Sequence, residues 1–149
     1  MAEVLFYHLD RQPLERVLPE LLEKCLERGW RAVVQFGSEE RCAAIDAHLW
    51  TYRDEGFLPH GTAQDGQAES QPIWLTVRDD NPNGATVRFV ADGSEPPDAS
   101  AYDRVVMLFD GNDNDAVDRA RAVWKTVKAA GHEATYWQQS ERGRWERKA

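Results

Sequence analysis

Basic and aromatic side chains recur at helical spacing between Val117 and Lys128 of the 149-residue chain. At 100° per residue, Val117 and Trp124 border an inner arc of alanine and valine, with Arg121, Lys125 and Lys128 just beyond them. An apolar shelf beside three cations suits a short acidic peptide that ends in an aromatic residue or a free carboxylate. The alternative is a solvated basic face on which Trp124 packs at the boundary of the core.

Phosphate-binding loops are missing from the sequence. A nucleotide site needs GxGxxG or GxxxxGK[ST] after a strand, because bare glycine backbone must approach the phosphates, and neither pattern occurs. The first predicted strand is followed instead by Asp10-Arg11-Gln12-Pro13, which contains no glycine. We therefore expect no cofactor.

Metal-binding and catalytic patterns are also missing. The four histidines form no HxxxH or HxH pair, and no GxSxG elbow is present. The run Asp110–Asp115 resembles a calcium loop, but position six is Asp115 where Gly is needed, and position twelve is Arg121 where Glu is needed. A helix start capped by Asn112 or Asp113 is the simpler interpretation. We expect no metal site, no catalytic residues and no enzymatic activity.

Composition is that of a globular protein, with 42% hydrophobic and 30% charged residues. No apolar run approaches the roughly 20 residues of a membrane span, and the N-terminal residues do not form a signal peptide. These features predict a cytoplasmic protein. Cys25 and Cys42 lie among apolar residues of predicted helices and are expected to be buried, reduced thiols.

Charge is distributed unevenly. The net charge of −8 argues against general nucleic-acid binding, which needs a basic face. Residues 1–115 carry 10 Lys and Arg against 22 Asp and Glu, whereas residues 116–149 carry 8 against 4. The pattern indicates a local cationic site on an acidic body.

Hydrophobic periodicity predicts one α/β domain spanning residues 1–149. Strands and helices alternate at first, which is typical of parallel strands in an α/β sandwich. Two later strands flank Asn-Pro-Asn-Gly and are interpreted as a β-hairpin. The fold class is a three-layer α/β/α sandwich with a Rossmann-like, mostly parallel or mixed sheet, a hairpin and no nucleotide-binding loop. The expected strands are 4–9, 31–36, 72–77, 85–91, 103–109 and 132–137; the expected helices are 13–28, one from 38, and 113–130; a basic C-terminal tail covers 139–149.

An aromatic connection follows the second predicted helix, with Trp50, Tyr52 and Phe57 close together in sequence. These rings either pack against the edge of the sheet or form a patch that binds a partner.

The whole chain resembles the chi subunit of bacterial DNA polymerase III, an accessory protein of the clamp-loader complex. LWTYRDEGFLPHG is the most specific segment, because a Leu-Trp that ends a helix and then Phe-x-Pro-His recur at this place in the family. The other segments that carry the resemblance are FYHLD, ERGWRAVV, IDAH, PIWLT, and DRVVMLFDG followed by WKTVKAAGHEATYW.

The resemblance implies a Rossmann-like fold without nucleotide binding and a role in DNA replication as a bridge between two partners. One partner is the acidic C-terminal tail of single-stranded-DNA-binding protein. Its site would comprise Phe109, Arg121, Trp124, Lys125, Lys128 and Tyr136, with Val117 from the apolar shelf. The other partner is the psi subunit, whose surface would include Trp50 and Phe57.

The sequence departs from the family at three places: Trp124 stands where another aromatic is usual, residues 62–71 form a variable polar loop, and the basic tail extends past the usual end. Direct DNA binding is expected to be weak or absent. The alternatives are a small nucleotide- or metabolite-binding α/β enzyme and nucleic-acid binding by the basic tail.

Overall fold

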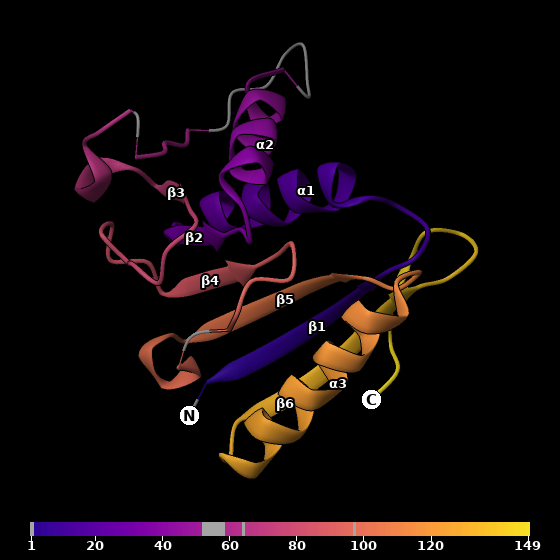
Figure 1. Ribbon diagram of the computed structural model, residues 1–149. Helices are drawn as coiled ribbons and strands as arrows, with labels where there is room; N and C mark the ends of the chain where they lie inside the picture. The colour runs from indigo at the N-terminus through magenta and orange to yellow at the C-terminus, as the bar shows by residue number, and fades with distance from the viewer. Residues whose placement is uncertain (1, 52–58, 64, 97) are drawn as a thin grey trace.

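A computed structural model describes residues 2–51, 59–63, 65–96 and 98–149. Strands and helices alternate in the first part of the chain as expected (Figure 1). The helices are α1 (Leu14–Glu27), α2 (Glu39–Thr51) and α3 (Asn114–Ala129), with short 3₁₀ turns η1 (Ala68–Ser70) and η2 (Ala99–Ala101). The strands are β1 (Glu3–Leu9), β2 (Ala32–Gln35), β3 (Ile73–Thr76), β4 (Val87–Val90), β5 (Arg104–Asp110), β6 (Glu133–Gln139) and β7 (Trp145–Arg147).

One sheet organises the molecule, with strand order β3-β2-β4-β5-β1-β6-β7. All neighbouring pairs are parallel except β6 and β7. Helices α1 and α2 cover one face of the sheet and α3 covers the other (Figure 1), and each face buries its own hydrophobic cluster. The structure is mixed α/β and matches the expected three-layer sandwich.

The predicted hairpin of residues 72–77 and 85–91 is wrong. Ala32 of β2 is paired with Ile73 of β3 on one side and with Val87 of β4 on the other, both in parallel. The connection between β3 and β4 therefore crosses over β2. A turn signal such as Asn-Pro-Asn-Gly predicts a change of chain direction, but it does not decide which strands become neighbours. The antiparallel pairing in the sheet is instead that of β6 with β7.

Arg88 holds this crossover connection in place. Its side chain is fully buried, and its guanidinium donates hydrogen bonds to the carbonyl oxygens of Arg78 (2.7 Å) and Asp80 (2.6 Å). It also donates to Oε1 of Gln35 (2.8 Å) and to the hydroxyl of Tyr102 (3.0 Å). A buried guanidinium needs several acceptors, and the crossover supplies two of them from its backbone.

Helix α3 begins as the sequence indicates. The carboxylate of Asp113 accepts hydrogen bonds from the backbone N–H groups of Asp115 (3.0 Å) and Ala116 (3.4 Å), which is a side-chain cap. Ser38 likewise caps α2 by accepting from the backbone N–H of Arg41 at 3.2 Å. The acidic residues before α3 thus start a helix on the face of the sheet opposite α1.

Two further expectations concern burial. Cys25 and Cys42 are confirmed as free, buried thiols. Within the described residues, no helix combines the length and apolar character that crossing a bilayer requires.

Candidate functional site

Five rings gather on the α3 face of the sheet, and we call them the α3-face cluster: Phe6, His8, Phe109, Trp124 and Tyr136. Trp124 of α3 packs edge-on against Phe6, with ring centroids 5.3 Å apart, and lies 6.2 Å from Tyr136. Phe109 lies 5.9 Å from Tyr136 and 5.4 Å from His8. Edge-to-face pairs at these separations are favourable beyond the area they bury.

Strand register explains why these rings meet. In the pairing of β1 with β5 and β6, Phe6 lies beside Tyr136, and His8 lies beside Phe109. Because side chains alternate between the faces of a strand, Phe6 and His8 point to the same face, and Phe109 and Tyr136 point with them. Three strands therefore supply four rings of the α3-face cluster, and α3 adds Trp124.

A stripe along α3 borders this cluster. Val117, Arg121, Trp124 and Lys128 follow one another at spacings of four, three and four residues, so they lie along one side of the helix. The ammonium of Lys128 lies 5.4 Å from the centre of the Trp124 ring, within cation–π range. Arg121, Lys125 and Lys128 are exposed, whereas Val117 and Trp124 are partly buried. The stripe thus sets cations beside an apolar surface.

Tyr136 connects the stripe to the end of β1. Its hydroxyl lies 2.6 Å from Nδ1 of His8. Burial raises the pKa of Tyr136, the nearby charge of Arg121 opposes this rise and that of Asp10 adds to it. Arg121 and Asp10 therefore shift the pKa of the phenol in opposite directions.

The expected peptide-site residues are largely brought together. Phe109, Trp124 and Tyr136 share the α3-face cluster, and Arg121 and Lys128 adjoin it. Val117 and Lys125 lie on the same helix; Lys125 is one turn after Arg121.

The sequence interpretation missed Phe6, His8 and Asp10 as members of this region. Phe6 and His8 are two positions apart, so the sequence indicates that they point to the same face of a strand. Which residues lie beside them depends on the register of the sheet, which the sequence does not give.

The second predicted surface is described only in part. Trp50 lies in α2 with half of its surface exposed (50%), and the centroid of its ring lies 4.7 Å from that of His60. Nε2 of His60 lies 2.9 Å from a carboxylate oxygen of Asp46. Phe57 lies outside the described residues. Trp50 is on the α2 side of the sheet, away from α3.

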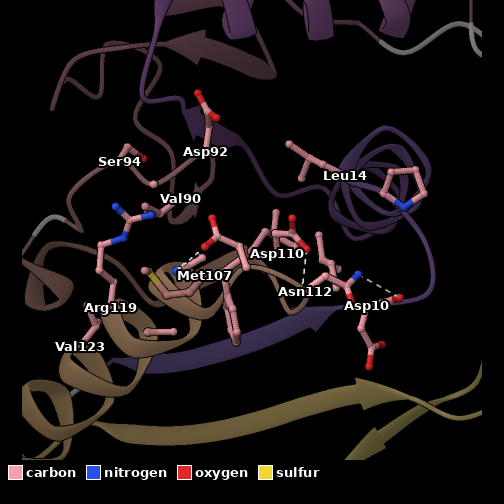
Figure 2. Close-up of a pocket in the computed structure, with 18 of the residues that line it drawn as sticks. Asp10, Leu14, Val90, Asp92, Ser94, Met107, Asp110, Asn112, Arg119 and Val123 are labelled. Carbon is pink, nitrogen blue, oxygen red and sulfur yellow. Dashed lines mark hydrogen bonds between the residues drawn. The ribbon is translucent and has the colours of Figure 1, made fainter.

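A cavity of about 890 Å³ opens at the carboxyl ends of β1, β4 and β5 (Figure 2). In open α/β sheets this is where ligands commonly bind. In Figure 2, Arg119 lies on the side of Ser94, and Asp10 and Asn112 lie on the opposite side near Leu14. Six carboxylates line the cavity against three guanidiniums, so its charge opposes phosphates: Asp10, Glu15, Asp92, Glu95, Asp110 and Asp113 against Arg11, Arg41 and Arg119. The described residues contain no cluster of three or more His, Cys, Asp or Glu that could hold a metal ion.

The side chain of Trp145 in the C-terminal segment does not lie on the α3 stripe. Residues 145–147 form β7, which is paired with β6 at the sheet edge. The Trp145 ring packs edge-on against Tyr7 at 4.7 Å and joins the hydrophobic cluster under α1 and α2. Trp145 therefore lies on the face of the sheet opposite α3.

Comparisons with known proteins identify a family that the chain resembles. A family model described as "DNA polymerase III chi subunit, HolC" matches residues 1–135. A curated relative from Rickettsia prowazekii (strain Madrid E), named "Probable DNA polymerase III subunit chi", is 31% identical over 87 residues. The aligned part covers 58% of this chain and 53% of that relative, so the match spans about half of the relative's length.

Proposed function

Because the chain belongs to the DNA polymerase III chi subunit family, we propose that it is a replication accessory subunit that links the clamp-loader complex to single-stranded-DNA-binding protein. In this proposal it binds the acidic C-terminal tail of that protein, is located in the cytoplasm and catalyses no reaction of its own. The observation that carries the proposal is the stripe of Arg121, Trp124 and Lys128 beside Tyr136.

Recognition of the acidic tail would combine two kinds of contact. The α3-face cluster offers aromatic edges and the apolar side of Trp124 to a terminal aromatic side chain of the tail. Arg121, Lys125 and Lys128 offer charge-assisted hydrogen bonds to its carboxylates. The strongly acidic remainder of the chain repels the tail from other surfaces, so the cations of α3 direct it to one place.

The test is a titration of a short acidic peptide that ends in phenylalanine with a free carboxylate. Removing both cations in the double variant Arg121→Ala, Lys125→Ala is expected to weaken binding at least tenfold, because each charged hydrogen bond contributes about 1.5–3 kcal/mol. Fluorescence anisotropy at two salt concentrations measures the affinity and its salt dependence, which should be smaller in the variant.

A matched control separates local contacts from overall charge. The double variant Arg142→Ala, Arg144→Ala removes the same charge from the exposed turn between β6 and β7. Its affinity for the peptide should stay within about twofold of the wild type, since these side chains are not part of the stripe. Equal affinities of all three proteins would rule out the α3 stripe as the site.

We further propose that Trp50, with Phe57, docks a psi-like subunit. Trp50 is the large hydrophobic side chain found exposed among the described residues, and exposed aromatic side chains are typical interface anchors. Since Trp50 and α3 lie on different faces of the sheet, both partners can bind together. Trp50→Ala should abolish co-purification of a psi-like subunit and leave peptide affinity unchanged; retention of the subunit would contradict this assignment.

The alternative function, a small nucleotide- or metabolite-binding enzyme, would use the cavity at the carboxyl ends of the strands. The excess of carboxylates there disfavours nucleotides, whose phosphates are anionic. A thermal-shift screen against nucleotides decides between the two: a reproducible stabilisation by any of them would favour the alternative.

A further inference from the structure

Three polar groups follow one another next to the α3 stripe: the carboxylate of Asp10, the imidazole of His8 and the hydroxyl of Tyr136. Nδ1 of His8 lies 2.6 Å from the Tyr136 hydroxyl, and Nε2 lies 3.8 Å from Oδ2 of Asp10. Gln138 donates a hydrogen bond to Oδ2 of Asp10 at 2.7 Å. Oδ1 of Asp10 is buried and has no hydrogen-bond partner within the described part of the chain.

The imidazole is held in this position from several directions. Phe109 packs edge-on against it, and Gly111 leaves the space that it occupies, because a Cβ at Gly111 would overlap the His8 ring. The charged and titratable groups around it include Asp10 directly after β1, Tyr136 on β6, and Arg121 on α3, which acts on Tyr136. Beyond β6, Glu146 of β7 is paired with Gln138, the residue beside His8. His8 is thus constrained to hydrogen-bond with Tyr136.

The protonation state of His8 decides whether the Tyr136 hydroxyl can donate a hydrogen bond to a ligand or only accept one. When Nε2 carries the proton and faces Asp10, Nδ1 accepts the phenol proton, and Tyr136 then offers only oxygen lone pairs to a ligand. The other neutral form would place the bare Nε2 lone pair opposite a carboxylate, which is unfavourable. When both nitrogens are protonated, Nδ1 donates to the phenol oxygen, and the phenol proton becomes available to a ligand.

A carboxylate ligand can only accept hydrogen bonds at neutral pH. Tyr136 can therefore bind it only as a donor, in addition to the cations of α3, and the ligand also benefits from the positive charge on His8. Burial raises the pKa of Tyr136, so the phenol keeps its proton throughout the neutral range. Asp10 supplies the negative charge that compensates a protonated imidazole.

We propose that His8 and Asp10 are positioning residues for carboxylate recognition: protonation of His8 makes Tyr136 a hydrogen-bond donor, so that binding of an acidic peptide takes up a proton. This inference rests on the proposed function, since it concerns the same binding surface. Peptide carboxylates do not titrate between pH 6 and 8, whereas histidine ordinarily does. Peptide affinity should therefore rise as the pH falls through this range.

The experiment measures the affinity of the acidic peptide at pH 6, 7 and 8 at constant ionic strength. The wild type is expected to bind about fivefold more tightly at pH 6 than at pH 8, a modest coupling by the usual scale. Calorimetric titrations at pH 7 in two buffers of different ionisation enthalpy should show net proton uptake on binding.

Two variants identify the group that takes up the proton. His8→Asn keeps an amide close to the position of Nδ1 but cannot titrate, so its affinity should be independent of pH and its proton uptake should be zero. Tyr136→Phe removes the hydroxyl and should lose most of the pH dependence, leaving only the part due to the charge of His8; this keeps the test decisive if His8→Asn fails to fold, because an unchanged pH profile in Tyr136→Phe would overturn the inference. Circular dichroism and thermal unfolding verify that each variant is folded.

The outcomes separate this inference from the proposed function. A wild type whose peptide affinity depends on Arg121 and Lys125 but not on pH would overturn this inference alone. A His8→Asn protein that keeps the wild-type pH profile would also overturn it. Failure of the wild type to bind the peptide at any pH would overturn both.

Discussion

The hydroxyl of Tyr136 lies 2.6 Å from Nδ1 of His8, although 128 positions separate the two residues in the chain. The contact joins the last long strand to the first one on the face that α3 covers. It links the apolar and the charged parts of the proposed peptide site, and it depends on the space beside Gly111.

Gly111→Ala should displace the His8 ring, because the added methyl group would overlap it. We expect a loss of about 1–3 kcal/mol in the free energy of unfolding, as for other overpacked sites. Urea denaturation measures this loss. In a His8→Ala background the same substitution should cost much less, since the overlap is gone; equal costs in both backgrounds would contradict the interpretation.

Arg88→Met should destabilise the protein by about 3 kcal/mol, because it leaves two carbonyl oxygens of the crossover and the buried Oε1 of Gln35 without their donor. The midpoint of urea unfolding gives the change. Arg16→Met is the matched control: Arg16 is exposed on α1, and its replacement should cost less than about 0.5 kcal/mol. Similar losses in both variants would show that the hydrogen bonds of Arg88 to the crossover do not stabilise the fold.

Cys25 and Cys42 should resist thiol reagents in the folded protein. Burial raises the pKa of both thiols from 9.0 to about 11, and the thiolate is the reactive form. At pH 8 a chromogenic disulfide reagent should label the thiols of the native protein slowly. After denaturation it should label both thiols at once. Because the unfolded thiols ionise near pH 9 and the folded ones near 11, the free energy of unfolding should fall as the pH rises through this interval. Rapid labelling of native protein would contradict the expectation.

Trp145→Ala should lower stability without changing peptide affinity. Trp145 packs on Tyr7 in the cluster under α1 and α2, so its loss should cost about 2 kcal/mol in the free energy of unfolding. The acidic peptide should bind as tightly as to the wild type, since α3 lies on the other face of the sheet. Weaker peptide binding by a folded Trp145→Ala protein would place the C-terminal segment at the peptide site after all.

Local patterns in the sequence decided much of the fold. The apolar stripe of α1, the caps Ser38 and Asp113, and the side of α3 that carries Arg121 and Trp124 follow from short-range periodicity. These features depend on residues within a few positions of one another, so spacing is sufficient to predict them. The family likeness carried by segments such as LWTYRDEGFLPHG could be seen at the same level.

Strand neighbours and register were decided by the tertiary structure. The sequence predicted a hairpin across Asn-Pro-Asn-Gly. In the structure, β3 and β4 lie on either side of β2, and the buried side chain of Arg88 holds the connection that crosses over β2. It predicted a basic C-terminal segment, but not that residues 145–147 form a strand with the Trp145 ring on the face of the sheet away from α3. It also gave no reason to place His8 beside Tyr136. Strand pairing joins segments that are distant along the chain, and the choice among possible partners depends on how both faces of the whole sheet are buried.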